Sequence, residues 1–333
     1  MKLVVEWIRK KPVLAFYIIC YAISWGLWLP LVLSRTDISE LLAAIGVFGG
    51  PAITCIIVAR VCSSPYQASR PVPFRLAFFG AWIACALVLT AYIHYTSEGS
   101  PPAALVVFAV LALIPAFVIA SAVSGASGVQ RTLSSLVRPK GWWGWYLLAV
   151  ALPLALRLAS VWLSGRLGWE LMSDPRPPAD PLKLAGSVLV IFLYTLLCAG
   201  GLNEETGWTG FALPRLLAKH NPLVSTIVVW ILWMLWHVPL HLSGYFDLNM
   251  HVLVGSFFGR FLLTWLFIRS SGGLLTAMLL HTSVNVTSQF VPLTNASLPI
   301  GVLVALMVVI GGRMWRHLPQ GSPAILAEES LAA

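Results

Sequence analysis

Long apolar stretches separated by short polar segments recur along the whole chain. A stretch of about 20 apolar residues is the length that an α-helix needs to cross a membrane. The pattern predicts ten such helices, near residues 12–33, 41–61, 74–95, 103–123, 144–165, 182–202, 222–242, 251–269, 273–290 and 297–315. The predicted fold class is therefore all-α, a polytopic integral membrane helix bundle.

The composition supports the membrane class. Hydrophobic residues make up 59% of the chain and charged residues 10%, against roughly 25% charged residues in soluble domains. The mean hydropathy is +0.86. The net charge of +9 does not indicate nucleic acid, because the basic residues form no single patch. Most of them flank the expected inner ends of the helices, which predicts an even number of spans and two cytoplasmic termini.

A polar, proline-rich segment, Ser173–Pro181 (SDPRPPADP), divides one integral unit into two parts. Residues 1–170 hold expected spans without a recognisable motif, and residues 182–316 hold the spans with polar chemistry. The tail 317–333 is expected to be cytoplasmic and disordered. In the eighth stretch, Gly255-x-x-x-Gly259 predicts a small-residue face for close helix packing.

Two adjacent acids, Glu204 and Glu205, follow a long apolar stretch in a chain with twelve acidic residues. Ionisable groups at membrane depth are costly and are retained chiefly where they have a function. If the helix continues through the pair to about Leu213, one carboxylate can face a cavity while its neighbour supports it. Pro214 is expected to end or kink this helix. The alternative is a wet cytoplasmic turn in which both acids cap a helix that begins near Gly207.

Three further polar residues interrupt apolar stretches of the second half. His237 lies in WILWMLWHVP, where Trp236 is expected at the membrane interface. His281 and Asn285 are four residues apart and therefore share one helix face. Hydrogen bonding between helices is the simpler explanation for each residue alone. Together with the glutamates they form a set suited to water activation or to zinc binding, although no HExxH motif is present.

The motifs around these residues resemble those of the CPBP intramembrane proteases, a family that contains the CAAX prenyl endopeptidases and the bacterial Abi proteins. Order and spacing agree over roughly residues 182–290. The matching segments are EETGWTGFALPRL at Glu204–Leu216, Trp233-x-x-x-His237, and the stretch from Thr264 through Gly272-Gly273 to His281-x-x-x-Asn285.

The resemblance implies an intramembrane endopeptidase that hydrolyses a peptide bond of a membrane-associated substrate. In the family-like mechanism Glu204 activates a water molecule, His237 helps to hold the water or a metal, and Glu205 supports the site. His281 and Asn285 stabilise the tetrahedral oxyanion. The family has long been called metalloproteases, so a divalent metal such as zinc on Glu204, His237 and His281 is one expectation. A metal-free glutamate mechanism is the other.

One position departs from the family motif EExxxR, because Thr209 stands where the arginine is expected. Arg260, near the middle of the eighth stretch, is costly at membrane depth unless it faces water or an acid. We therefore expect Arg260 to supply the missing positive charge, either to Glu205 or to the substrate. The alternative is that its helix starts later and Arg260 reaches the outer interface. Arg157 is similarly placed in the fifth stretch.

Two other classes of function stay open from the sequence. Thr209 favours a catalytically weak or inactive family member that acts as a membrane binding or immunity protein. The Glu and His groups also suit a proton-coupled transporter, although no internal repeat is visible. The expected partners are a peptide or protein substrate and the lipid bilayer, with no nucleic acid. The expected location is the bacterial plasma membrane, and the sequence does not determine the oligomeric state.

Overall fold

The computed structural model describes residues 2–62, 72–96, 102–124 and 127–325. Within these ranges the regular elements are all helical, apart from one isolated antiparallel bridge between Leu171 and Thr294. The all-α bundle that the sequence predicts is confirmed. The helices are α1 (Lys2–Lys10), α2 (Pro12–Leu33), α3 (Asp37–Val61), α4 (Phe74–Thr96), α5 (Pro102–Leu111), α6 (Leu113–Ser124), α7 (Ser127–Val137), α8 (Gly144–Leu167), α9 (Pro181–Leu197), α10 (Gly200–Gly207), η1 (Trp208–Ala212), α11 (Leu213–Leu217), α12 (Pro222–Leu242), α13 (Met250–Arg269), α14 (Leu274–Phe290) and α15 (Ser297–Gly311).

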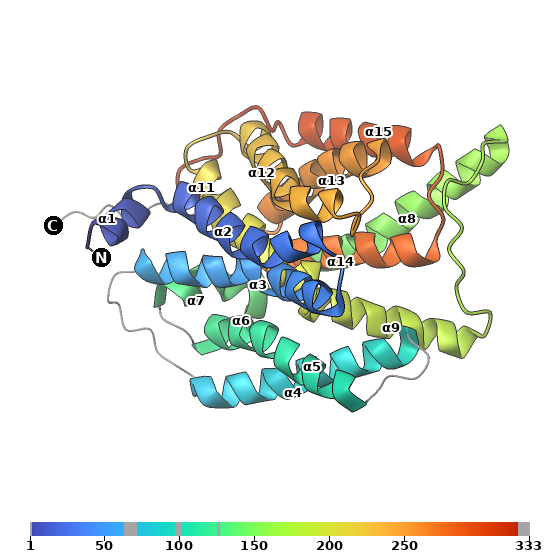
Figure 1. Ribbon diagram of the computed structural model, residues 1–333. Helices are drawn as coiled ribbons and strands as arrows, with labels where there is room; N and C mark the ends of the chain where they lie inside the picture. Colours follow the sequence, from blue (N-terminus) through green and yellow to red (C-terminus); the bar gives the residue numbers. More distant parts are fainter. Residues whose placement is uncertain (1, 63–71, 97–101, 125–126, 326–333) are drawn as a thin grey trace.

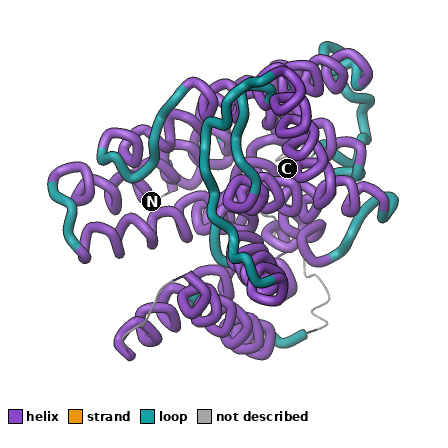
Figure 2. The backbone as a smooth tube through the Cα atoms, turned by 90° about the vertical axis from the view of Figure 1, so that its right-hand side faces the viewer, coloured by secondary structure: helices purple, strands orange, loops and turns teal. Residues whose placement is uncertain are grey.

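The bundle is arranged in layers (Figure 1). Helices α4, α5 and α6 lie at the bottom of that view, α2, α3 and α14 lie in the middle, and α12, α13 and α15 lie at the top. Seen from the side, helices fill the molecule and long loops run across the face turned to the viewer (Figure 2). One of these loops is the proline-rich connection between α8 and α9.

Among the described residues, seven helices are long and apolar enough to cross a membrane. The number rises to eight if the bent pair Asp37–Val47 and Gly49–Val61 counts as one span. All ten predicted stretches are helical, but α14 and α15 contain only 17 and 15 residues. The chain is thus a multi-pass membrane protein, while the number ten and the side of the termini stay predictions.

The segment that carries the two glutamates is broken once, just before them. Helix α9 ends at Leu197, and Ala199 leaves the helical region of backbone space with φ −122° and ψ −139°. The Asn203 side chain then donates a hydrogen bond of 2.9 Å to the Cys198 carbonyl, which the break leaves without its helical partner. Helix α10 therefore starts in a defined register, and Glu205 follows Asn203 by two positions.

The same segment continues well beyond the glutamates. Over Trp208–Ala212 it widens into a π-helical turn in which the Leu213 N–H bonds the Trp208 carbonyl, five residues back. The wide turn directly precedes Pro214, whose ring clashes with the carbonyl four residues earlier in a regular helix. The helix then runs to Leu217, so of the two expectations for Pro214, an end or a kink, the end is wrong. The alternative of a wet turn at the glutamates is also wrong, because Glu204 and Glu205 are buried inside α10.

An aromatic core joins the two halves of the chain. Trp208 of η1 and Trp236 of α12 are fully buried, with ring centroids 5.5 Å apart. Phe16 of α2 packs against Trp208 at 5.4 Å, and Trp28 of α2 packs against Trp236 at 4.7 Å. The prediction that Trp236 marks the membrane interface is therefore wrong. Because α2 supplies half of this core, the N-terminal helices help to hold the glutamate-bearing segment in place.

The beginning of the expected disordered tail is packed. Ala324 is 1% exposed and belongs to the main core, and Leu318 packs against the same cluster. Residues 326–333 of that tail lie outside the described residues.

Gly207 is the point where the glutamate-bearing segment approaches α2 and α3 most tightly. A Cβ atom at this position would lie 2.7 Å from Pro51 Cβ, 2.8 Å from Phe16 Cζ and 3.0 Å from the Pro51 carbonyl oxygen. A proline ring and a backbone carbonyl cannot rotate away, so any side chain must displace α3.

We predict that Gly207→Ala lowers the free energy of unfolding by about 1–3 kcal/mol, the usual cost of overpacking. Thermal unfolding of the purified protein in nanodiscs measures this effect. Gly80→Ala is the matched control, because a Cβ at Gly80 in α4 meets nothing within 4 Å. This control is expected to be neutral or slightly stabilising. Equal stability of the two variants would contradict the assignment of Gly207 as a tight contact.

Candidate active site

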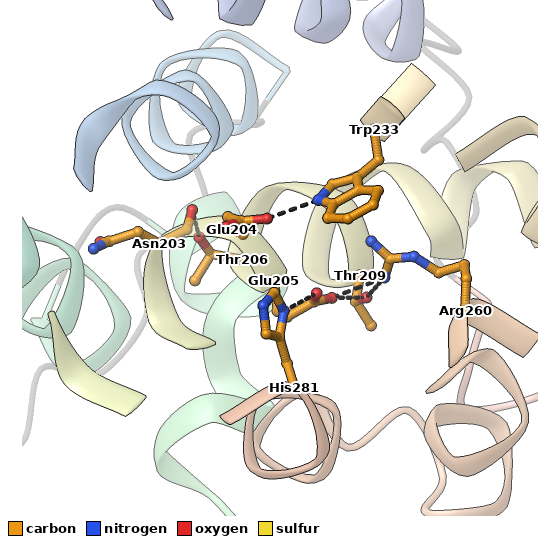
Figure 3. A network of polar contacts seen from close by, with 8 residues as sticks. All are labelled: Asn203, Glu204, Glu205, Thr206, Thr209, Trp233, Arg260 and His281. Atoms are coloured by element: carbon orange, nitrogen blue, oxygen red, sulfur yellow. Dashed lines mark hydrogen bonds and ion pairs between the residues drawn. The ribbon is translucent and has the colours of Figure 1, made fainter. Parts of the chain in front are cut away.

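Glu205 lies at the centre of a buried polar network formed by α10, η1, α13 and α14 (Figure 3). Its side chain is 1% exposed. Oε1 accepts a hydrogen bond from His281 Nδ1 at 2.7 Å. Oε2 accepts from Arg260 Nη1 at 3.0 Å and from the Thr209 hydroxyl. Both oxygens of Glu205 are thus occupied, which suits the residue to holding its neighbours rather than to taking up a proton.

Arg260 supplies the positive charge that the motif lacks. Its side chain is 5% exposed and forms an ion pair with Glu205, and it also donates to the Thr209 hydroxyl at 3.3 Å. The prediction that Arg260 faces Glu205 is confirmed, and the alternative that it reaches the outer interface is wrong. A buried carboxylate needs a cation and several hydrogen bonds to offset its desolvation. Here α13 provides the cation, and Thr209, at the position of the family arginine, bridges it to Glu205.

Glu204 has one bonded oxygen and one open oxygen. Oε2 accepts a hydrogen bond of 2.7 Å from the Trp233 indole nitrogen. Oε1 makes no hydrogen bond to a described residue and lies beside Gly200. A Cβ atom built on Gly200 would lie 3.1 Å from this oxygen and 2.7 Å from His281 Nε2. Glu204 Oε1 and His281 Nε2 therefore both pack against Gly200, and any side chain at residue 200 would collide with them.

His237 is held by the same tryptophan. Its Nδ1 lies 2.9 Å from the Trp233 carbonyl oxygen. A carbonyl only accepts hydrogen bonds, so Nδ1 carries the proton and Nε2 keeps a free lone pair. Trp233 thus fixes Glu204 through its indole N–H and His237 through its backbone.

The two imidazoles and the open carboxylate form one electrostatic cluster. Glu204 lies close enough to both His237 and His281 for a direct charge interaction. These residues come from α10, α12 and α14, which are far apart in the sequence. The sequence predicts that these residues form one site, which is possible only if the three helices converge.

A cavity of about 560 Å³ opens beside the network. Its lining includes Glu205, His281, Asn285, Arg260 and Trp233. Asn285 lies one turn beyond His281 on α14 and is partly exposed, with no side-chain hydrogen bond to the described part of the chain. This volume lies within the range of roughly 300–1,000 Å³ that is typical of ligand sites.

Two of the predicted site residues do not line this cavity. Glu204 and His237 are absent from its lining, whereas Trp233, to which both are bonded, is present. In Figure 3 the indole of Trp233 lies between Glu204 and Arg260. The structure therefore gathers the predicted residues into one cluster, in which Trp233 links Glu204 and His237 to the residues that line the cavity.

The donor arrangement does not fit a metal ion. Among the described residues there is no group of three His, Cys, Asp or Glu side chains that could hold one. The hydrogen bonds of His281 Nδ1 and of one Glu204 oxygen leave His281 Nε2 and the other oxygen free, so the finding rests on the positions of the side chains and not on these bonds. The set Glu204, His237 and His281, which the sequence offers for zinc, does not form a shared ligand position in this structure.

Three residues of the site have roles that the sequence did not predict. Asn203 sets the start of α10, and Gly200 allows Glu204 Oε1 and His281 Nε2 to lie close together against the backbone. Trp233 is expected from the sequence only as an aromatic motif position, but its indole N–H also bonds Glu204. The sequence contains one signal for this role, because the tryptophan at this motif position carries an N–H donor that phenylalanine lacks.

Comparisons with known proteins point to the same segment. Residues 186–287 match the family model described as Type II CAAX prenyl endopeptidase Rce1-like. Over 113 residues the chain is 27% identical to the CAAX prenyl protease 2 of Methanococcus maripaludis. That match covers 31% of this chain and 41% of the archaeal protein, so the chain matches less than half of its relative's length.

The matched residues include Glu204, Glu205, His237, His281 and Asn285, all of which the motif resemblance singled out. The resemblance to the CPBP intramembrane proteases is thereby confirmed over residues 186–287.

Proposed function

We propose that this chain is an intramembrane endopeptidase that hydrolyses a peptide bond of a membrane-associated protein or peptide. The observation that carries the proposal is the close approach of the open carboxylate oxygen of Glu204 and of His281 Nε2, both of which lie against Gly200. A general base and a hydrogen-bond donor this near to each other are what water-driven amide hydrolysis requires. We assign the catalysis to the segment 182–316, with residues 1–170 as its scaffold, in the bacterial plasma membrane.

In the proposed mechanism a water molecule is bound at Glu204 Oε1. Glu204 Oε1 takes a proton from this water as the water attacks the carbonyl carbon of the substrate. His237 accepts a hydrogen bond from the water on its free Nε2 lone pair. Trp233 keeps Glu204 and His237 oriented through its two hydrogen bonds. The protonated Glu204 then delivers the proton to the leaving amine, and the peptide bond is broken.

The opposite side of the site stabilises the oxyanion. With Nδ1 of His281 donating to Glu205, a proton on Nε2 can be directed to the developing negative charge. The Asn285 amide, on the same face of α14, donates a second hydrogen bond. Glu205 stabilises the positive imidazole, as the aspartate does in a serine protease triad. Arg260 keeps Glu205 ionised for this role.

The alternative of a non-catalytic binding or immunity protein rested on Thr209. Since Arg260 provides the cation that Thr209 cannot, this departure from the motif no longer argues against turnover. No feature of the described residues favours the transporter alternative over proteolysis.

Glu204→Gln is expected to reduce cleavage by about 10²–10⁴-fold, because the amide keeps the size and one oxygen of the side chain but cannot accept the proton. The assay is cleavage of a synthetic peptide library by the purified protein in nanodiscs, read by mass spectrometry. The matched control is Glu6→Gln at an exposed position of α1. An unchanged rate in a folded Glu204→Gln protein would contradict the mechanism.

The ion pair between Arg260 and Glu205 is tested by a double-mutant cycle. Arg260→Met and Glu205→Gln should each lower stability strongly, by about 3–5 kcal/mol for loss of one partner of a buried pair. Their effects should be coupled by about 1 kcal/mol or more in thermal unfolding. Arg269→Met at the end of α13 is the control and should be additive with Glu205→Gln. Strict additivity for Arg260 would show that the pair does not act as a unit.

Trp233→Phe removes one hydrogen-bond donor but keeps an aromatic ring in place. We predict a fall in kcat of roughly 10-fold with little change in KM, because Glu204 loses the bond that orients it, worth about 1.5–3 kcal/mol for an ionised acceptor. Trp230→Phe, one turn earlier on α12, is the matched control, since its indole bonds Ser256 instead. A Trp233→Phe protein with normal kcat would remove Trp233 from the positioning of Glu204.

A further inference from the structure

Arg157 is a second arginine at membrane depth, and it takes no part in the network around Glu205. It lies in α8 (Gly144–Leu167), about 15 Å from the nearer end of the helix at 1.5 Å per residue. Its backbone carbonyl accepts a hydrogen bond from Ser160. Its guanidinium forms no hydrogen bond or ion pair with any residue of the described ranges. Such a cation is costly in a membrane helix unless water or an anion meets it.

Arg157 borders two hollow spaces in this half of the molecule. It lines the cavity of about 560 Å³ that contains Glu205 and His281. It also lines a neighbouring, mostly apolar hollow of about 200 Å³ between α8, α13, α14 and α15. The unpaired guanidinium is therefore positioned where the two spaces adjoin, on the α8 side of the proposed active site.

The glycine face of α13 keeps this region open. Gly255 and Gly259 line both spaces. A Cβ atom at either glycine would meet nothing within 4 Å, so no helix packs closely against this face. The prediction that Gly255-x-x-x-Gly259 serves close helix packing is wrong. These glycines instead leave room in front of Arg157 that bulkier residues would fill.

The larger cavity reaches from the network to the loops. Besides Glu205 and His281, its lining includes Ser173, Asn249 and Leu293. These three residues lie in the connections before α9, before α13 and before α15. A peptide that enters from these loops towards His281 thus passes through a space that Arg157 also borders.

We propose that Arg157 forms an anion subsite that binds a carboxylate of the peptide held in the cavity. This inference rests on the proposed function and names a feature of its substrates. A planar guanidinium matches a carboxylate with two parallel hydrogen bonds, and the pair relieves the cost of the isolated cation. The carboxylate comes either from the C-terminus of the peptide or from an Asp or Glu side chain.

A lipid phosphate is the less suitable anion because Arg157 lies far from the membrane surfaces. Lipid headgroups lie at the surfaces of a hydrocarbon core about 30 Å thick. Arg157 lies about 15 Å from the nearer end of α8, which places it near the middle of that core. A group carried by the substrate can reach this depth through the cavity, whereas a headgroup must leave the interface.

The test uses a synthetic decapeptide library prepared in four forms. The C-terminus is either a free acid or an amide, and the internal positions either include Asp and Glu or replace them by Asn and Gln. The full-length protein in phosphatidylcholine nanodiscs is assayed for cleavage by mass spectrometry. Binding of the same four forms to the Glu204→Gln protein gives a readout that does not depend on turnover.

We expect the wild-type protein to prefer one carboxylate-bearing form by about 10- to 100-fold in kcat/KM, the range of one charge-assisted hydrogen bond. A preference for the free-acid form identifies the C-terminus as the source of the carboxylate. A preference for the amide form with Asp and Glu identifies a side chain as the source. Arg157→Met should abolish this preference, because the variant lacks the guanidinium that distinguishes the forms. Arg157→Lys keeps the charge but not the two parallel N–H donors of the guanidinium, so this variant should retain part of the preference.

Arg166→Met is the matched control, since Arg166 lies on the same helix, stacks over Trp162 and lines neither space. An equal carboxylate preference in wild type and Arg157→Met, or no preference in either, overturns the proposal. So does a dependence on anionic phosphatidylglycerol in the nanodiscs that disappears in Arg157→Met, which would assign the site to lipid. If no form is cleaved but the Glu204→Gln protein binds the carboxylate forms through Arg157, the proposed function fails while the anion subsite stands.

Discussion

A carboxylate that is removed from water needs a cation and hydrogen-bond donors around it, and Glu205 imposes this requirement on three separate helices. Arg260 of α13, His281 of α14 and Thr209 of η1 each contribute one partner to the same side chain. None of these partners can move far without leaving a buried charge uncompensated. The ion pair between Glu205 and Arg260 and the hydrogen bonds beside it therefore constrain the mutual positions of the helices. The neighbouring Glu204 takes no part in these contacts and keeps one oxygen open.

The backbone around Glu205 is adapted to this network. A break at Ala199, stabilised by Asn203, sets the register of α10. Thr209 follows Glu205 by four residues, so both lie on one helix face and their side chains bond. The π-helical turn over Trp208–Ala212 then accommodates Pro214, and wide turns of this kind are frequent at functional sites. On the other side, Trp208 packs between Phe16 and Trp236, so the N-terminal helices hold the same segment from behind.

The protein also shows that the cation beside the second glutamate can come from either of two positions in a chain. A motif that places arginine four residues after the second glutamate keeps the cation on the same helix. Here that position is Thr209, and Arg260 brings the cation from α13. The electrostatic requirement is met in both arrangements, because it depends on the distance between charged atoms and not on which helix carries them. A motif mismatch at a charged position is thus weak evidence for loss of function when another arginine at membrane depth lies elsewhere in the chain.

The sequence by itself determined the class of the fold and named the candidate residues of the site. Helix-length apolar stretches can be read locally, because each helix satisfies its own backbone hydrogen bonds in a membrane. Buried acids and histidines also stand out in such stretches, which is why Glu205, His281 and even Arg260 could be named in advance. The tertiary structure alone decided which of them touch, that Trp233 holds Glu204 and His237, and that Gly255 and Gly259 border a cavity beside Arg157. These features depend on the packing of helices that are distant in the chain, and local patterns of polarity carry no information about that packing.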